Sequence, residues 1–222
     1  MYNPPIFYLN CDIRTAEMKR ANLSFKRITK NVEYTNIVFI TVGDQDSNNI
    51  LVYSNETDNN EYIELFYKDY KSIVYSNKNI FDDDWKLIEI ICSGLVNKYT
   101  RINIGKSVFD SELDEFSDFI TKCRDNGTLV ICLYTSEIHS DEVWEYGIKD
   151  LYFRRVIKKW IDNSVWDKVL NNSNKIETSK TLSDELKVLN FAFYLSGREM
   201  PQRLFGFSRT DRKKGLIGYG WM

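Results

Sequence analysis

Apolar residues in the first part of the chain come in short runs, and polar stretches such as GDQDSNN and NETDNN separate these runs. The runs are rich in β-branched and aromatic residues, and runs of this kind bounded by turn residues are typical of β-strands. The pattern therefore predicts an antiparallel meander, with strands at residues 36–42, 50–54, 62–68 and 72–76.

After residue 80 the spacing of the apolar residues changes from that of strands to that of helices. Apolar residues of DDDWKLIEIICSGLVNKY recur at helical spacing, and DSELDEFSDFITKCRDNG carries a second stripe of this kind that ends at Gly127. The runs RINI (101–104) and TLVICLYT (128–135) predict two strands, and the second is apolar enough to be covered on both faces. Because one helix joins them, we expect these two strands to be parallel.

The last third of the chain is predicted to be mostly helical. Helices are expected at residues 141–162 and 181–196, and Gly197 stands where the second helix should end. The tail 203–222 alternates well enough to form a hairpin. Near the start of the chain, residues 12–23 could make one short helix.

These elements predict an α+β (mixed α/β) fold. An antiparallel meander continues into a strand–helix–strand unit, so that one mixed sheet is flanked by helices and followed by a helical C-terminal third. We expect a mixed-sheet core over residues 1–140 and a basic helical region over residues 141–222 packed on it, together forming one compact domain.

The composition limits the class of protein and the cellular location that can be expected. With 222 residues, 43% of them hydrophobic, the chain can bury a sizeable core. No apolar run approaches the ~20 residues that a membrane span needs. The first residues lack the pattern of a secretory signal, so we expect a cytoplasmic protein without a membrane partner. The abundance of Asn, Lys, Ile and Tyr indicates AT-rich coding, as in a phage or mobile element.

Residues that commonly carry catalysis are few. His139 is the only histidine, and a core thiol is a better interpretation of Cys132 than a Cys–His pair with it. The sequence INIGKS ends like a phosphate loop, but Thr100 stands where the first glycine is needed. We therefore expect no catalytic residues, no metal and no cofactor. The cysteines form no C-x-x-C pair and are predicted to be buried free thiols: Cys11, Cys92, Cys123 and Cys132.

Charge divides the chain into two unlike parts. Residues 1–148 hold 15 Lys and Arg against 24 Asp and Glu, a net charge of −9, whereas residues 149–222 hold 15 against 8, a net charge of +7. Such asymmetry suggests a polyanionic partner for the basic part.

Two basic elements lie in that part. In LYFRRVIKKWI four cations fall on one helical face, and five apolar residues share the opposite face: Phe153, Val156, Ile157, Trp160 and Ile161. In the tail, cations stand among aromatic residues and glycines. Cations neutralise phosphates and aromatic rings stack on bases. The sequence thus predicts nucleic-acid or anion binding at Arg154, Arg155, Lys158, Lys159, Arg203, Arg209, Arg212, Lys213 and Lys214, with stacking by Phe207, Tyr219 and Trp221.

The first functional hypothesis is therefore a non-catalytic binding protein that docks on nucleic acid or an acidic protein through its basic C-terminal third. For the tail, the alternative is a terminal β-hairpin with a charged turn and its aromatic residues in the core. The sequence leaves the oligomeric state open.

A second hypothesis is an inhibitor or immunity-type protein that binds a protein partner through its acidic N-terminal part. It depends on nine carboxylates: Asp44, Asp46, Asp58, Asp82, Asp83, Asp84, Glu112, Asp114 and Glu115.

A third hypothesis comes from the order of elements over about residues 36–160. Antiparallel strands followed by helix, strand, helix, strand and helix resemble the RNase H-like superfamily, in which carboxylates on two strands and a helix bind two metal ions. The resemblance implies a metal-dependent nuclease that uses Asp44, Asp84 and Asp110. Neither NIVFITV nor RINI contains an acid. We therefore expect a fold of this kind to lack the two-metal site.

Overall fold

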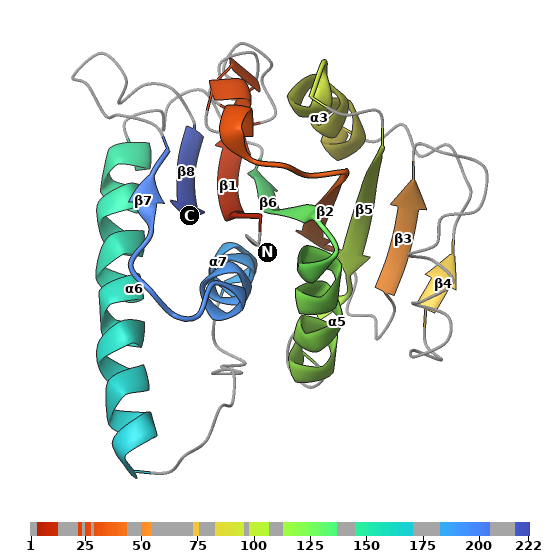
Figure 1. Cartoon of the computed structure of the whole chain (residues 1–222). Coiled ribbons are helices and arrows are strands. Elements are labelled where there is room, and N and C mark those ends of the chain that lie inside the picture. Colours follow the sequence, from red (N-terminus) through yellow and green to blue (C-terminus); the bar gives the residue numbers. More distant parts are fainter. Residues whose placement is uncertain are drawn as a thin grey trace.

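The structure is a computed structural model of the whole chain (Figure 1). It describes residues 4–12, 22–23, 25–27, 29–43, 50–54, 73–75, 83–95, 98–106, 113–136, 145–170, 183–204 and 216–222. All structural statements below concern these residues.

A single mixed sheet of eight strands forms the centre of the described structure, in the order β4-β3-β5-β2-β6-β1-β8-β7. The four inner strands β5, β2, β6 and β1 run parallel, while β3 and β8 are antiparallel to their inner neighbours. The strands are β1 (Ile6–Asp12), β2 (Asn36–Val42), β3 (Ile50–Ser54), β4 (Ile73–Tyr75), β5 (Tyr99–Ile104), β6 (Thr128–Ser136), β7 (Gln202–Arg203) and β8 (Leu216–Trp221).

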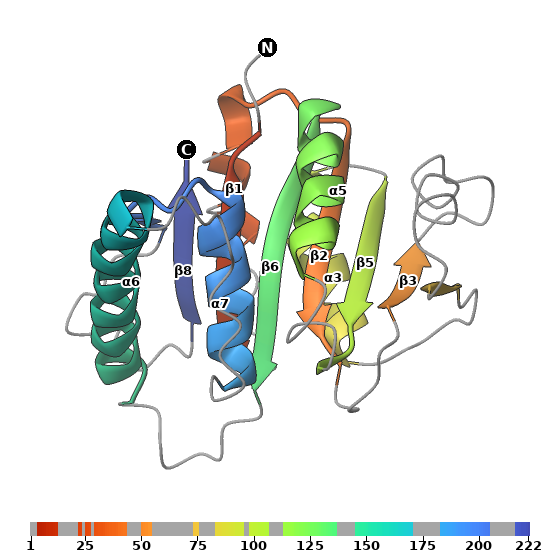
Figure 2. The same cartoon turned by 90° about the horizontal axis from the view of Figure 1, so that it is seen from below.

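Helices cover both faces of this sheet (Figure 2). One face packs against α5 (Leu113–Asp125), α6 (Glu145–Leu170) and α7 (Asp184–Leu195). The other face packs against α3 (Asp83–Cys92) and the ring of Phe25, and the short 3-10 helix η1 (Thr29–Asn31) follows Phe25 in the chain. The result is a three-layer arrangement with two apolar cores, which confirms the predicted α+β class with one mixed sheet flanked by helices. None of the described helices is both long and apolar enough to cross a membrane.

Strand β1 is central, although the sequence did not predict it. It pairs with β6 on one side and with β8 on the other, and its apolar side chains are completely buried. The run IFYLNC is nearly continuous in apolar residues, as strands covered on both faces usually are. Because β8 comes from the tail, the C-terminal region contributes directly to the sheet; the division at residue 140 remains a prediction.

The predicted meander is wrong in its strand pairing. β2 does not pair with β3 but lies between β5 and β6, parallel to both. β3 pairs with β5, and its contact with β4 is parallel. A strand as buried as β2 gains more from a central position than from a hairpin with its sequence neighbour. The predicted strand at 62–68 and most of the predicted helix at 12–23 lie outside the described residues.

The predicted helix–strand order after residue 80 is confirmed. β5 and β6 are parallel, as expected of two strands joined by one helix, but they flank β2 instead of touching each other. Gly127 follows α5 with φ +84° and Gly197 follows α7 with φ +82°. Glycine adopts this left-handed conformation without a steric penalty, which explains where both helices end.

The predicted terminal hairpin is also present, because β7 pairs antiparallel with β8. Gly220 of β8 faces a crowded position, since an added Cβ would lie 2.7 Å from Leu204 Cδ2 and 3.0 Å from the ring of Phe7. We predict that Gly220→Ala lowers the free energy of unfolding by about 1–3 kcal/mol through overpacking. Urea denaturation measures this change; a variant as stable as the wild type would show that Leu204 can move aside at little cost.

Candidate binding sites

The carboxyl ends of the parallel strands form the edge where open α/β sheets usually bind ligands. The start of α3 lies over this edge on one face, because Asp84 contacts Thr135 near the end of β6. The start of α7 lies over it on the other face, because Glu185 contacts Asn10 near the end of β1. Two buried side-chain oxygens in the described structure have no hydrogen-bond partner, and both are here: Asn10 Oδ1 and Asn103 Oδ1.

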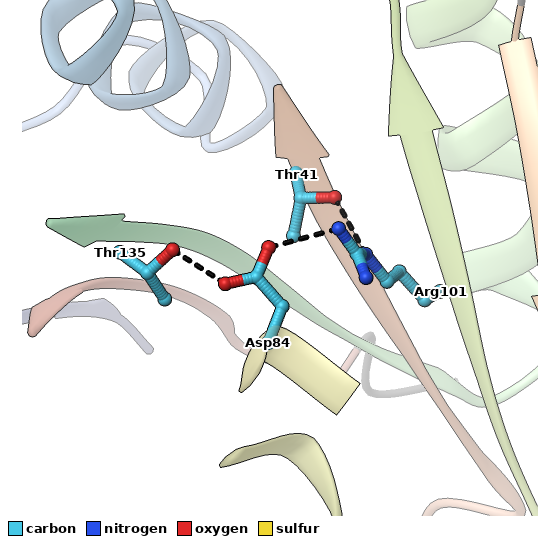
Figure 3. Close-up of polar contacts among 4 residues, drawn as sticks. All are labelled: Thr41, Asp84, Arg101 and Thr135. Carbon is cyan, nitrogen blue, oxygen red and sulfur yellow. Dashed lines mark hydrogen bonds and ion pairs between the residues drawn. The ribbon is translucent and has the colours of Figure 1, made fainter. Parts of the chain in front are cut away.

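On the α3 face, a polar network surrounds Arg101 (Figure 3). The Arg101 side chain is only 4% exposed and its Nη2 lies 2.8 Å from Asp84 Oδ2. Its Nε donates a hydrogen bond of 3.0 Å to Thr41 Oγ1, and its guanidinium lies over the ring of Tyr53. The Thr135 hydroxyl donates to the other oxygen of Asp84. Three elements, β5, β2 and β6, are thus tied to the N-terminus of α3.

This network argues against Asp84 as a metal ligand. Both carboxylate oxygens already accept hydrogen bonds, and one of them faces a guanidinium at 2.8 Å, where a metal ion would have to displace a buried cation. Asp44 and Asp110, the partners required by the nuclease hypothesis, lie outside the described residues. Among the described residues, no three His, Cys, Asp or Glu side chains form a possible metal site. The meander that carried the RNase H-like resemblance is not formed either.

On the α7 face, Asn10 is completely buried. Its Nδ2 lies 3.3 Å from both Tyr8 Oη and Glu185 Oε2, and the Tyr8 hydroxyl donates to the Glu185 carbonyl. Lys149 of α6 pairs with the same Glu185 carboxylate at 2.6 Å. Burial raises the pKa of Tyr8 well above its usual value, with a smaller contribution from the Glu185 charge, so its hydroxyl remains a donor.

A third network joins α6 to the last two strands. Asp150 is 2% exposed; its Oδ1 accepts a hydrogen bond of 2.6 Å from the Tyr219 hydroxyl, and its Oδ2 pairs with Arg203. Burial and the Asp150 hydrogen bond raise the pKa of Tyr219. Arg203, predicted to bind anions, therefore already has a carboxylate partner.

The stacking predicted for two tail aromatics does not fit their burial. Tyr219 is completely buried and stacks on Tyr8, while Trp221 is 7% exposed and donates its Nε1 hydrogen to the Glu199 carbonyl. No ring face of Tyr219 is open to a base. The alternative from the sequence, a hairpin with its aromatic residues in the core, is confirmed for these two residues. Phe207 and the remaining predicted tail cations lie outside the described residues: Arg209, Arg212, Lys213 and Lys214.

The predicted amphipathic helix is confirmed in α6. Phe153, Ile157 and Trp160 are buried, whereas Arg155, Lys158 and Lys159 are exposed and Arg154 is half-buried.

The sequence did not single out three apolar residues one to two turns earlier on α6. Ile148 and Leu151 are each 55% exposed and Tyr152 is 49% exposed. Spacings of three and four place them in line with Arg155 and Lys159. We call Ile148, Leu151, Tyr152, Arg155, Lys158 and Lys159 the α6 outer face.

The acidic N-terminal part can be judged at one residue only. Asp84 is paired with Arg101 and is 21% exposed, so its charge is not presented to a partner. The side chains of the other eight carboxylates in that hypothesis lie outside the described residues.

The four cysteines are buried and free, as predicted. Burial raises the pKa of Cys123 to about 12 and also raises the pKa of Cys92 and of Cys132. These thiols stay protonated at neutral pH, which makes them poor nucleophiles. His139, the other member of the conceivable Cys–His pair, lies outside the described residues.

An open hollow lies at the opposite edge of the sheet, between residues 29–35 and the end of α5. Its cation, Arg124, donates to the Pro4 and Leu195 carbonyls. Burial lowers the pKa of this guanidinium. Arg124 therefore holds the ends of β1 and α7 together, and we assign this hollow no ligand.

Comparison with known proteins identifies the fold alone. No protein-family model and no curated protein matches the sequence. The structure is similar to the crystal structure of an uncharacterized protein, JW3007 from Escherichia coli K12, with a TM-score of 0.57 and 10% sequence identity. The match covers 99% of this chain and 100% of the other. At this identity the likeness shows a shared fold and carries no information on function.

Proposed function

We propose that this protein is a non-catalytic binding protein that docks on an acidic protein partner through the α6 outer face. The observation that carries the proposal is the exposure of Ile148, Leu151 and Tyr152 directly beside three exposed cations. Adjacent large apolar side chains are costly to leave in water, and exposed apolar patches commonly mark interaction sites.

Two features favour a protein partner over nucleic acid. Nucleic-acid interfaces are dominated by phosphate contacts and are polar, so Ile148 and Leu151 would gain little from them. In addition, the chain as a whole has a net charge of −2, without the strong basic excess that is typical of nucleic-acid-binding domains. A partner with carboxylates around an apolar patch would satisfy both halves of the α6 outer face.

Two triple variants test the two halves separately. Replacing Ile148, Leu151 and Tyr152 by serine should lower the affinity for the partner by about 100-fold or more, because buried aromatic and aliphatic anchors dominate interface energies. Replacing Arg155, Lys158 and Lys159 by glutamate should slow association by about tenfold or more and reverse its salt dependence, because attraction to the acidic partner becomes repulsion. The partner is first captured from the native host with nuclease present, and affinities and association rates are then measured by surface plasmon resonance with the purified partner.

A matched control carries the same charge change elsewhere. Arg27, Lys30 and Lys122 are exposed and do not belong to α6; their replacement by glutamate should leave the affinity unchanged. Loss of capture on nuclease treatment, with binding intact in the serine triple variant, would instead identify nucleic acid as the partner and contradict the proposal.

A further inference from the structure

Asn10 stands out among the buried polar residues because half of its amide is unsatisfied. The side chain is completely buried, and its Nδ2 has two partners while its Oδ1 has none. Both Nδ2 contacts are 3.3 Å long, slightly longer than the usual N–H···O distance. Buried acceptors without a donor are rare in folded proteins and commonly mark a missing ligand or water.

The position of Asn10 points to a ligand. It lies two residues before the end of a central parallel strand, under the first turn of α7. Ser183 supplies no side-chain cap to that helix, but its carbonyl accepts hydrogen bonds of 2.9 Å from the amides of Leu186 and Lys187. Asn10, Tyr8, Glu185 and Lys149 form one cluster of polar side chains. This cluster reaches the surface through Lys149 and Glu185, whose side chains are 26% and 19% exposed.

The surrounding charges define the class of ligand. Lys149 neutralises Glu185 at 2.6 Å, and Lys106 neutralises Asp184 at 2.9 Å. A charged ligand would therefore find no unpaired counter-charge among these groups. The group holds acceptors, namely Asn10 Oδ1 and the two carboxylates, together with the ammonium donors of Lys106 and Lys149. Hydroxyl groups both donate and accept, so they can bond to both kinds of group.

We propose that this cluster binds an uncharged polyhydroxyl compound, a pentose or the ribose of a nucleoside, with one hydroxyl donating to Asn10 Oδ1. The site shares no residue with the α6 outer face, so either proposal can fail without the other. Free sugar and nucleoside share the hydroxyl chemistry, and the probes below distinguish them.

Thermal unfolding tests the proposal with D-ribose, adenosine and 2′,3′-dideoxyadenosine. Saturating D-ribose or adenosine should raise the midpoint of the wild-type protein by about 5–10 °C. Dideoxyadenosine, which lacks the hydroxyls, should not. A rise with adenosine alone identifies a nucleoside, and a rise with both identifies the sugar hydroxyls as sufficient. No rise with either, or an equal rise with dideoxyadenosine, would overturn the proposal.

Asn10→Leu links the effect to this side chain. It should abolish the ligand-induced rise, while the ligand-free midpoint stays the same or increases by about 2–4 °C because an unsatisfied acceptor is removed. The matched control is Asn22→Leu, since Asn22 is also buried but its Nδ2 bonds the carbonyls of residues 90, 91 and 93. Asn22→Leu should unfold at lower temperature and keep the ligand response. A response retained by Asn10→Leu would refute the proposal.

A measurement on the wild-type protein covers the case in which Asn10→Leu does not fold. With selective 15N labelling of asparagine, the side-chain amide signals of Asn10 should shift on titration with D-ribose or adenosine. Signals that stay in place while the ligand is saturating would place any binding elsewhere and overturn the assignment.

Discussion

Replacing Asp84 by alanine should lower the free energy of unfolding by about 3–5 kcal/mol. The variant leaves Arg101, whose side chain is 4% exposed, as a buried cation without its carboxylate. It also removes the acceptor of the Thr135 hydroxyl. Urea denaturation followed by far-UV circular dichroism measures the loss, and an unchanged slope against urea would show that stability alone has changed.

The double variant Asp84→Leu with Arg101→Met is the control for this prediction. Because no charge is left unpaired, it should lose far less than Asp84→Ala, about 0–2 kcal/mol. A loss below about 1 kcal/mol in Asp84→Ala itself would mean that water or a neighbouring group compensates Arg101, and that the network is not what holds α3 on the sheet.

From the sequence, Asp84 was named as a member of an acidic surface and as a candidate metal ligand, whereas it stands at the start of α3, which begins at Asp83. What the sequence could not show is the partner, because Arg101 and Thr135 are 17 and 51 residues further along the chain. Contacts of this kind depend on which strands lie side by side. Local pattern fixes the type of an element but says little about its neighbours in the sheet.

The predicted pairing of the strands was wrong for the same reason. Turn residues between 36–42 and 50–54 favoured a hairpin, yet the nearly continuous apolar run NIVFITV is typical of a strand covered on both faces. The run IFYLNC has this pattern too. Giving more weight to continuous apolar runs than to turn signals would have placed both strands in the centre of the sheet.

Some residues of the proposed binding sites could be predicted from the sequence. Helical spacing predicted the cations of α6 and the buried face of the helix, and the same spacing extended by two turns would have aligned Ile148 and Leu151 with Arg155. In the tail, alternation placed Tyr219 and Trp221 on a strand, but it could not show that β1 and α6 cover them. Asn10 could not be predicted as a binding residue, because an asparagine in an apolar run is recognised as one only once its hydrogen-bond partners are known.

Replacing Asp150 by alanine should lower the free energy of unfolding by about 2–3 kcal/mol. Most of this loss comes from the Tyr219 hydroxyl, which is completely buried and would lose its 2.6 Å acceptor. The pair with Arg203 contributes less, about 0–1 kcal/mol, because that side chain is 37% exposed and screened by water. Arg203→Met should therefore be much milder than Asp150→Ala in the same urea titration.

A double-mutant cycle between Asp150→Ala and Tyr219→Phe isolates the shared hydrogen bond. If the two groups act as a unit, the double variant should be about 1 kcal/mol more stable than the sum of the single losses predicts. Additive losses would show that Asp150 acts through Arg203 or through helix packing instead.

The variant Asp150→Ala also tests whether the α6 outer face, the proposed binding surface, depends on the stability of α6. Asp150 lies on α6 between the exposed Ile148 and Leu151, and its contacts with Tyr219 and Arg203 fix that part of the helix to β8 and β7. Asp150→Ala should therefore increase hydrogen exchange of the amides in the first turns of α6 more than in α5 or α7. If the α6 outer face binds a partner as a rigid surface, the affinity should fall as well, although Asp150 itself is buried and touches nothing outside the protein.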